Sequence, residues 1–158
     1  MQETAKSLRE VIKSQMESLL AISEDEAAHK TQPDKWSKKE ILGHLIDSAA
    51  NNQMKFVKLL EESEAAIIGY KQDNWVQTQK YQEANWQELL TLWAAYNSHL
   101  AHIIEHTPEE VLSHKLTVNS SGPFTLEFIM KDYVEHLKHH LLQILPKANL
   151  RSTFKMVY

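Results

Sequence analysis

Apolar residues recur at intervals of three and four positions in four segments of the chain, which is the spacing of one helix face. The segments span about residues 3–22, 37–62, 85–106 and 125–145, and proline, glycine or serine interrupts the pattern between them. Helices of about 20 residues are about 30 Å long. The pattern therefore predicts an all-α fold, an up-down-type four-helix bundle with almost no β-strand.

Capping signals mark where two of these helices begin. Ser37 is followed three residues later by Glu40, the pattern of a capping box, and Trp36 is placed to pack on Ile41 as a hydrophobic staple. Thr125 is the expected N-cap of the last helix. We therefore expect the second and fourth helices to start at these residues.

A long connection, residues 64–84, separates the second and third predicted helices. Connections of this length in a compact domain are often functional or pack as a cap. The connection also leaves room for a departure from the simplest up-down order. The sequence shows no internal repeat and no low-complexity tract, so we expect a single domain over residues 1–158.

Composition and charge narrow the possible environments and partners. Hydrophobic residues make up 42% of the chain, but no apolar run reaches the ~18–20 residues of a membrane helix. The first residues are polar and charged, unlike a signal peptide, so we expect a cytoplasmic protein that binds no membrane. The net charge is −4 and the only arginines are Arg9 and Arg151, which argues against nucleic acid as a partner.

The chain has no cysteine, which excludes disulfides, thiolate metal sites and a cysteine nucleophile, but it has nine histidines. Three of them, His99, His102 and His106, follow one another along the third predicted helix. They lie roughly opposite its apolar face, which includes Leu100 and Ile103. We therefore predict that these three histidines form a solvated polar face and are not metal ligands.

The fourth predicted helix carries His136, His139 and His140. His136 and His140 are four residues apart at the border of the apolar arc, so their rings can turn toward one point, whereas His139 lies outside that arc. This is the spacing of a helix-borne pair of metal ligands. It is equally compatible with two half-buried histidines that bond to neighbouring residues.

A stable site for a divalent metal usually needs a third protein ligand, and His44 is the leading candidate. It lies ~10 Å into its helix and His136 lies ~16 Å into the fourth, depths that agree within about a turn if the two helices run in the same direction. His44 lies on the polar side of its helix, near Glu40 and Asp47. That position fits either an exposed histidine or the wall of a polar cleft.

Three segments of the sequence resemble motifs of one family. "QPDKWSKKEILGHLIDSAANN" and "DYVEHLKHHLLQI" resemble the second-helix and fourth-helix motifs of the DinB/YfiT-like superfamily of metal-dependent enzymes, and "GYKQDNWV" resembles a segment between its second and third helices. The resemblance covers most of residues 31–145. It maps the metal ligands of the family onto His44, His136 and His140.

The resemblance implies a DinB-like four-helix bundle, often a homodimer, that holds zinc, nickel or a similar divalent ion and acts on a small-molecule substrate. The superfamily includes thiol-dependent transferases and isomerases, so the resemblance also implies a low-molecular-weight thiol as a possible cofactor. Fold membership supports a metal site better than it supports a particular substrate. The sequence itself assigns no catalytic residue.

Three neutral imidazoles leave a bound metal its full charge and an open position, where a water or thiol would ionise near neutral pH. Because only neutral histidine binds, we expect occupancy to fall below about pH 6.5. Asp47 and Asp132 are placed either to orient a ligand histidine or to face solvent, and solvent exposure is commoner for aspartate. Further cleft residues are expected to be Ser48, Asn51, Asn52 and Tyr133.

Two classes of function fit these features. The first is a metal-dependent transferase or hydrolase that acts on a small molecule. The second is a non-catalytic bundle that binds metal or a small ligand, as a stress-response or interaction module. A polar cleft beside an open metal position would favour the first class, and a filled coordination shell or a dry, closed bundle would favour the second.

Overall fold

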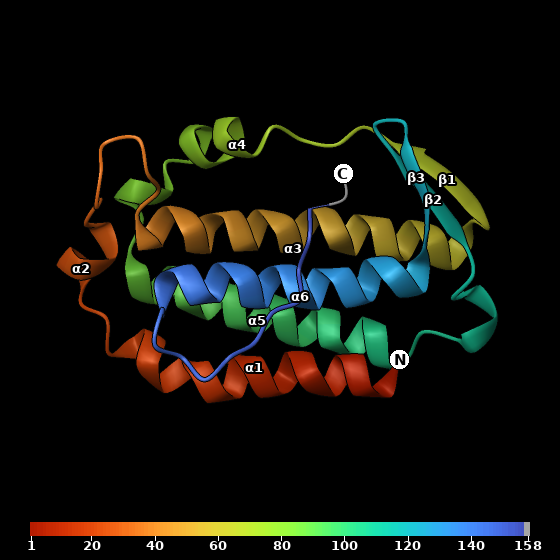
Figure 1. The fold of residues 1–158 in the computed structure, drawn as a ribbon, viewed down its shortest axis with the longest axis horizontal. Coiled ribbons are helices and arrows are strands. Elements are labelled where there is room, and N and C mark those ends of the chain that lie inside the picture. The colour runs from red at the N-terminus through yellow and green to blue at the C-terminus, as the bar shows by residue number, and fades with distance from the viewer. Residues whose placement is uncertain (157–158) are drawn as a thin grey trace.

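Four long helices form the body of the protein (Figure 1). In the computed structural model, which describes residues 1–156, they are α1 (Gln2–Leu20), α3 (Lys38–Glu61), α5 (Trp86–Glu105) and α6 (Leu126–Ile144). These bounds agree with the four predicted segments to within two residues at each end. The predicted helical bundle is therefore confirmed in its main elements.

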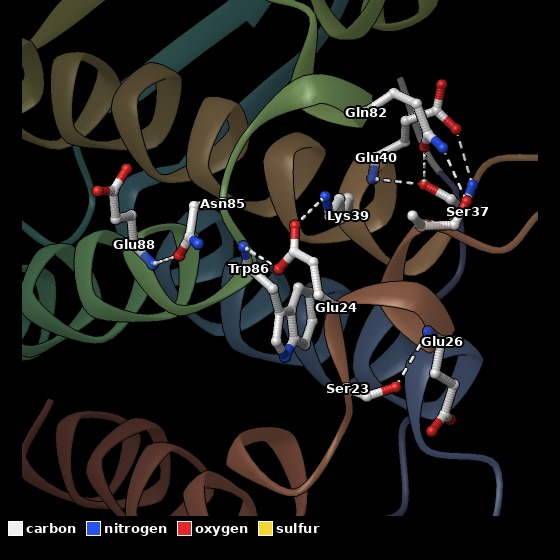
Figure 2. Close-up of polar contacts among 11 residues, drawn as sticks. Ser23, Glu24, Glu26, Ser37, Lys39, Glu40, Gln82, Asn85, Trp86 and Glu88 are labelled. Carbon is white, nitrogen blue, oxygen red and sulfur yellow. Dashed lines mark hydrogen bonds and ion pairs between the residues drawn. The ribbon is translucent and has the colours of Figure 1, made fainter.

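The predicted caps are also present. The Ser37 hydroxyl accepts a hydrogen bond from the Glu40 amide, and the Glu40 carboxylate accepts one from the Ser37 amide at 2.7 Å, which completes the capping box. The Thr125 hydroxyl accepts a hydrogen bond from the amide of Phe128 at the start of α6. Ser23 and Asn85 cap two further helices in the same way (Figure 2).

The order of the helices around the bundle departs from the simple up-down arrangement. Helix α1 packs against α5 and α6, and α3 packs against the same two helices, so α1 and α3 lie diagonally opposite. In Figure 1, α3 and α5 run in one direction and α1 and α6 in the other. The parallel direction of the second and fourth helices, which was the condition for comparing the depths of His44 and His136, is therefore not found: α3 and α6 are antiparallel neighbours.

The connection after α3 explains this arrangement. It carries the chain back along the outside of the bundle, so that α5 begins at the same end as α3 (Figure 1). It contains β1 (Glu64–Ile67), α4 (Gln72–Thr78) and a 3-10 turn, η1 (Tyr81–Glu83). A return segment of this kind makes α3 and α5 parallel, which a short loop between them could not do.

A small three-stranded sheet closes one end of the bundle, and it corrects the expectation of almost no strand. Strand β2 (Lys115–Val118) pairs in parallel with β1 and antiparallel with β3 (Ser121–Thr125). The strands are only four or five residues long, and β3 contains Gly122 and Pro123, which favour a loop when read from the sequence alone. The main architecture remains helical.

At the other end of the bundle, one carboxylate joins three helices (Figure 2). Glu24 of α2 (Glu24–Ala28) bonds to the Lys39 ammonium of α3 and accepts a hydrogen bond of 3.0 Å from the Trp86 amide of α5. The Trp86 indole is fully buried and donates to the carbonyl of Leu19 in α1. This cluster fixes the start of α3, which carries the first candidate ligand.

Two further findings concern a short turn after α5 and the character of the helices. A short 3-10 turn, η2 (Glu109–Val111), follows α5. None of the helices within residues 1–156 has the length and apolar character that crossing a bilayer requires.

Candidate metal centre

The fold brings His44, His136 and His140 together between α3 and α6. Each offers a ring nitrogen, and these nitrogens lie within 4.8 Å of one another. The Nε2 atoms of His44 and His136 are 3.3 Å apart, and the centre of the His140 ring lies 4.6 Å from that of His44 and 4.5 Å from that of His136. The three predicted residues therefore form one cluster.

The antiparallel packing of α3 and α6 accounts for this cluster. His44 is the seventh residue of α3, counted from Lys38, and His140 and His136 are the fifth and ninth from the end of α6 at Ile144. Since the end of α6 packs beside the start of α3, the two histidines of α6 lie just above and below the level of His44. The predicted grouping is present, although the parallel packing used to predict it is wrong.

Burial controls the charge of the cluster. His44 is completely buried, and His136 and His140 are half-buried. Desolvation, with a smaller contribution from the neighbouring histidines, lowers the pKa of His44 to about 3 and that of His136 to about 2. The pKa of His140 is also lowered, mainly by burial. All three imidazoles are therefore neutral at pH 7, which is the form that binds a metal.

Two neighbouring side chains orient the rings. Gln143 Oε1 lies 3.1 Å from His140 Nδ1, and Ser48 Oγ lies 3.4 Å from His136 Nδ1. If each Nδ1 donates its proton to that oxygen, each Nε2 presents a lone pair to the centre of the cluster. His44 differs, because its Nδ1 is buried without a hydrogen-bond partner within residues 1–156. The Trp36 ring lies 5.1 Å from the His44 ring.

The role of Asp47 differs from the two considered in the sequence analysis, which were to orient a ligand histidine or to face solvent. It is only 3% exposed, so the expectation of a solvent-facing charge is wrong. Its Oδ1 accepts hydrogen bonds from Gln79 (2.6 Å) and from the Tyr81 hydroxyl (2.8 Å), two residues of the connection. Burial raises the pKa of Asp47, and these two hydrogen bonds oppose the rise. Asp47 therefore fastens the connection to α3, one turn beyond His44.

A pocket of about 360 Å³ opens beside the histidines. His136 and His140 form part of its wall, and all four residues predicted to line the cleft contribute to it, namely Ser48, Asn51, Asn52 and Tyr133. The hydroxyl of Tyr133 donates a 2.5 Å hydrogen bond to Asn97 in the core, so only the rest of this side chain faces the pocket. The cluster thus adjoins a space large enough for a small molecule.

The C-terminal segment covers one side of this pocket. Phe154 lines it, with its ring 5.0 Å from that of His136 and 5.5 Å from that of His139. The segment is held to α6 because Glu135 accepts hydrogen bonds from the amide of Thr153 (2.6 Å) and from the Ser152 hydroxyl (2.8 Å, through its carbonyl). Phe154 therefore shields His136 from solvent.

Comparison with known proteins agrees with this arrangement. The family model of the DinB superfamily matches residues 7–144. The chain belongs to the DinB superfamily. No curated protein matches the sequence.

A solved structure shows the same DinB-superfamily fold. YfiT from Bacillus subtilis, described as a probable metal-dependent hydrolase with an unusual four-helix bundle topology, superposes with a TM-score of 0.82. The match covers 91% of this chain and 83% of YfiT at 19% sequence identity. At that identity, the likeness supports the helix order found here and says nothing direct about substrate.

A second group of candidate ligands lies on α5 of this DinB-superfamily chain. Nitrogen and oxygen atoms of His102, Glu105 and His106 also lie within 4.8 Å of one another. Both histidines are exposed, and the Glu105 carboxylate accepts a 2.7 Å hydrogen bond from Arg9. Unlike the first cluster, this group is therefore not buried, and its carboxylate already accepts a hydrogen bond instead of being available to a metal. That the histidines of α5 are not ligands stays a prediction.

Several residues around the DinB-superfamily site were missed by reasoning from the sequence. Gln143 follows His140 by three residues, a helical spacing that could have pointed to it. Tyr81 and Gln79 lie more than 30 positions from Asp47, so no local spacing connects them. Lys55 looks like an ordinary surface lysine in the sequence, but it is 8% exposed and lines the pocket.

Proposed function

We propose that the protein is a metal-dependent enzyme that acts on a small molecule, as a hydrolase or a thiol-dependent transferase. His44, His136 and His140 would hold a single divalent ion, with zinc or nickel the first candidates because neutral imidazoles suit both. The observation that carries the proposal is a cluster of three neutral histidines, one buried and two half-buried, that adjoins a polar pocket. Membership of the DinB superfamily and the description of YfiT add support.

The residues fit such an ion. Two neutral imidazoles whose Nε2 atoms are 3.3 Å apart can share at most one hydrogen bond, and the third ring adds another lone pair. Two nitrogens bound tetrahedrally at about 2.0–2.1 Å from zinc lie about 3.3–3.4 Å apart. The separation of the Nε2 atoms of His44 and His136 therefore supports their assignment as two ligands of one ion. A divalent ion would satisfy lone pairs that the surrounding protein leaves without donors.

The pocket favours an enzyme over a non-catalytic bundle. A divalent ion bound by three imidazoles keeps an open position and lowers the pKa of a bound water or thiol, which supplies a nucleophile in a chain without cysteine. Ser48 and Gln143 hold two of the rings in place, and Phe154 excludes solvent from His136. Asn52 lines the pocket, and its Oδ1 has no hydrogen-bond partner within residues 1–156, so it is available to accept a hydrogen bond from a substrate.

The proposal is tested with protein purified without an affinity tag. Its metal content is measured first, and the protein loaded with zinc or nickel is then assayed against a panel of esters and amides, and against electrophiles with low-molecular-weight thiols. We expect turnover that chelation abolishes and that His136→Ala lacks. A protein that binds metal stoichiometrically and yet turns over none of these substrates would favour the non-catalytic alternative.

A further inference from the structure

A buried lysine lines the same pocket as the histidines. Lys55 of α3 is 8% exposed, yet it contributes to the pocket wall together with Asn51, Asn52 and Asp132. Burying an ammonium group is costly unless the charge is compensated. A lysine in this position therefore calls for a partner of opposite charge, either from the protein or from a ligand.

The electrostatic surroundings leave Lys55 charged. Burial lowers the pKa of its ammonium to about 8, and the Asp132 carboxylate of α6 acts in the opposite direction. At pH 7 the lysine is therefore mostly protonated. An ammonium group has three N–H donors that point in different directions, so a carboxylate on one side does not engage all three. Because Lys55 lines the pocket, an anion bound there would lie close to its ammonium group.

The position of Lys55 along α3 determines how far it lies from the histidines. It lies seven residues beyond Ser48, which contacts His136, so the two Cα atoms are about 10 Å apart along α3. Asp132 lies four residues before His136, about 6 Å along α6. The charged pair is thus displaced by about 6–10 Å along the helix axes from His136, the nearest histidine of the cluster, at another part of the same pocket.

We propose that Lys55 is a specificity-determining residue that binds a carboxylate group of the substrate. The substrates would be small carboxylic acids in which the carboxylate lies about 6–10 Å from the atom presented to the histidines. A monoanion fits better than a phosphate dianion, because the Asp132 carboxylate near Lys55 repels a dianion more strongly than a monoanion. This inference rests on the proposed function and adds the substrate class.

The alternative is that Lys55 and Asp132 only stabilise the packing of α3 on α6. The two explanations differ in their effect on ligands. A structural pair would influence charged and neutral ligands equally, whereas a binding residue affects only the anionic ones. Matched ligands that differ in this single group therefore separate the two explanations.

The probes are 6-mercaptohexanoate and the neutral 6-mercaptohexanol, which share a thiol for the metal and have the same chain length. Their affinities for the zinc-loaded protein are measured by calorimetry at pH 7, with 3-mercaptopropionate as an acid too short to span the distance. We expect the six-carbon acid to bind about tenfold to a hundredfold more tightly than the alcohol, the range for a hydrogen bond to a charged group. The short acid should gain little.

Four variants complete the test. Lys55→Met keeps the apolar stem and should remove the preference for the acid while leaving the affinity for the alcohol unchanged. Lys55→Arg should retain the preference, and Asp132→Asn should increase it by removing the competing carboxylate. Lys58→Met is the matched control one turn further along α3, where the lysine pairs with Glu62 outside the pocket. It should behave as the wild type.

Two results would overturn the inference while leaving the proposed function intact. One is equal affinity of the wild type for the acid and the alcohol. The other is a Lys55→Met variant that keeps the preference or loses affinity for both probes alike. If neither thiol binds the zinc-loaded wild type, the metal centre itself is contradicted, and the inference fails with it.

Discussion

The Nε2 atoms of His44 and His136 face each other at 3.3 Å across the interface of two antiparallel helices. His44 is buried, His136 is half-buried and both rings are neutral, so each ring carries a single proton and at most one hydrogen bond joins the two atoms. His140 adds a third ring to the same centre. The two Nε2 atoms can share one hydrogen bond, and a cation would engage all three rings, which is the basis of the predictions that follow.

Removal of any one of the three histidines should abolish tight metal binding. His44→Ala, His136→Ala and His140→Ala should each lower the affinity more than about a hundredfold, beyond the loss typical of residues that only support a ligand. The fold should largely survive, since the apolar core of α3 and α6 is unchanged. Titration with zinc and circular dichroism measure both effects. His139→Ala is the control, because this exposed residue is outside the cluster; binding lost only in that variant would refute the assignment.

The two supporting side chains should have smaller effects. Gln143→Met and Ser48→Ala remove the acceptors beside His140 Nδ1 and His136 Nδ1, so the rings lose their fixed orientation. We expect each variant to bind zinc about ten to a hundred times more weakly than the wild type. Competition with a chelator of known affinity measures the change. Unaltered affinity in both variants would mean that packing alone orients the rings.

Replacement of the histidines of α5 should leave the metal content unchanged. His99, His102 and His106 are exposed, and the neighbouring Glu105 is already bonded to Arg9. The triple glutamine variant is therefore expected to bind one equivalent of zinc with wild-type affinity, as measured by elemental analysis after gel filtration. A drop in stoichiometry or affinity would move the metal site to α5.

The metal-free protein should lose stability as the pH falls below about 6.5. The pKa values of His44 and His136 are about 3 and about 2 in the folded state, against about 6.5 in the unfolded chain. Between these values the unfolded chain binds more protons, so acid favours unfolding, by at most about 1.4 kcal/mol per pH unit for each histidine. Urea unfolding between pH 7 and pH 4 tests this slope. The double variant His44→Gln, His136→Gln should flatten it.

The same pKa values alter the pH dependence expected for the metal. The ordinary histidine pKa predicts loss of the ion below about pH 6.5. Burial keeps the imidazoles of the folded protein neutral to lower pH, so protons compete less effectively with the ion. Loss of zinc should therefore occur at a pH below 6.5 and should accompany unfolding. This is checked by following zinc release and circular dichroism in one acid titration.

The sequence was sufficient for features that depend on neighbouring residues. The four long helices, the capping box at Ser37 and the His136–His140 pair all follow from short spacings. The relative direction of α3 and α6 did not, because it depends on where the long connection carries the chain. His44 was placed beside the pair by an argument from parallel helices, and the antiparallel packing reaches the same contact from the opposite end.

Contacts between distant parts of the chain could not be predicted. The burial of Lys55 depends on the packing of α6 and the sheet around the pocket, and nothing in its neighbours along the sequence reveals it. The three short strands escape prediction because their pairing, between segments about 50 residues apart for β1 and β2, stabilises residues with weak local preference. The burial of Asp47 beneath the connection likewise depends on a contact between distant residues, the hydrogen bond from the Tyr81 hydroxyl.

The last prediction concerns Gly43, which precedes His44 in α3. A Cβ atom at this position would lie 2.2 Å from the Tyr81 ring, so the glycine makes room for the residue that holds Asp47. Gly43→Ala should destabilise the protein by about 1–3 kcal/mol through this overlap, although alanine is favoured over glycine in a helix by about 1 kcal/mol. Urea unfolding of the metal-free protein measures the change.

A double-mutant cycle separates the two effects on Gly43. In a Tyr81→Ala background the ring is gone, so Gly43→Ala should become stabilising by up to about 1 kcal/mol, the helix preference alone. The sign of the substitution should therefore reverse between the two backgrounds. The Tyr81→Ala variant itself should be less stable than the wild type, because it loses a buried ring and leaves Asp47 with Gln79 as its remaining side-chain donor of those observed. If Gly43→Ala destabilises both backgrounds equally, the contact with Tyr81 is not the reason for the glycine.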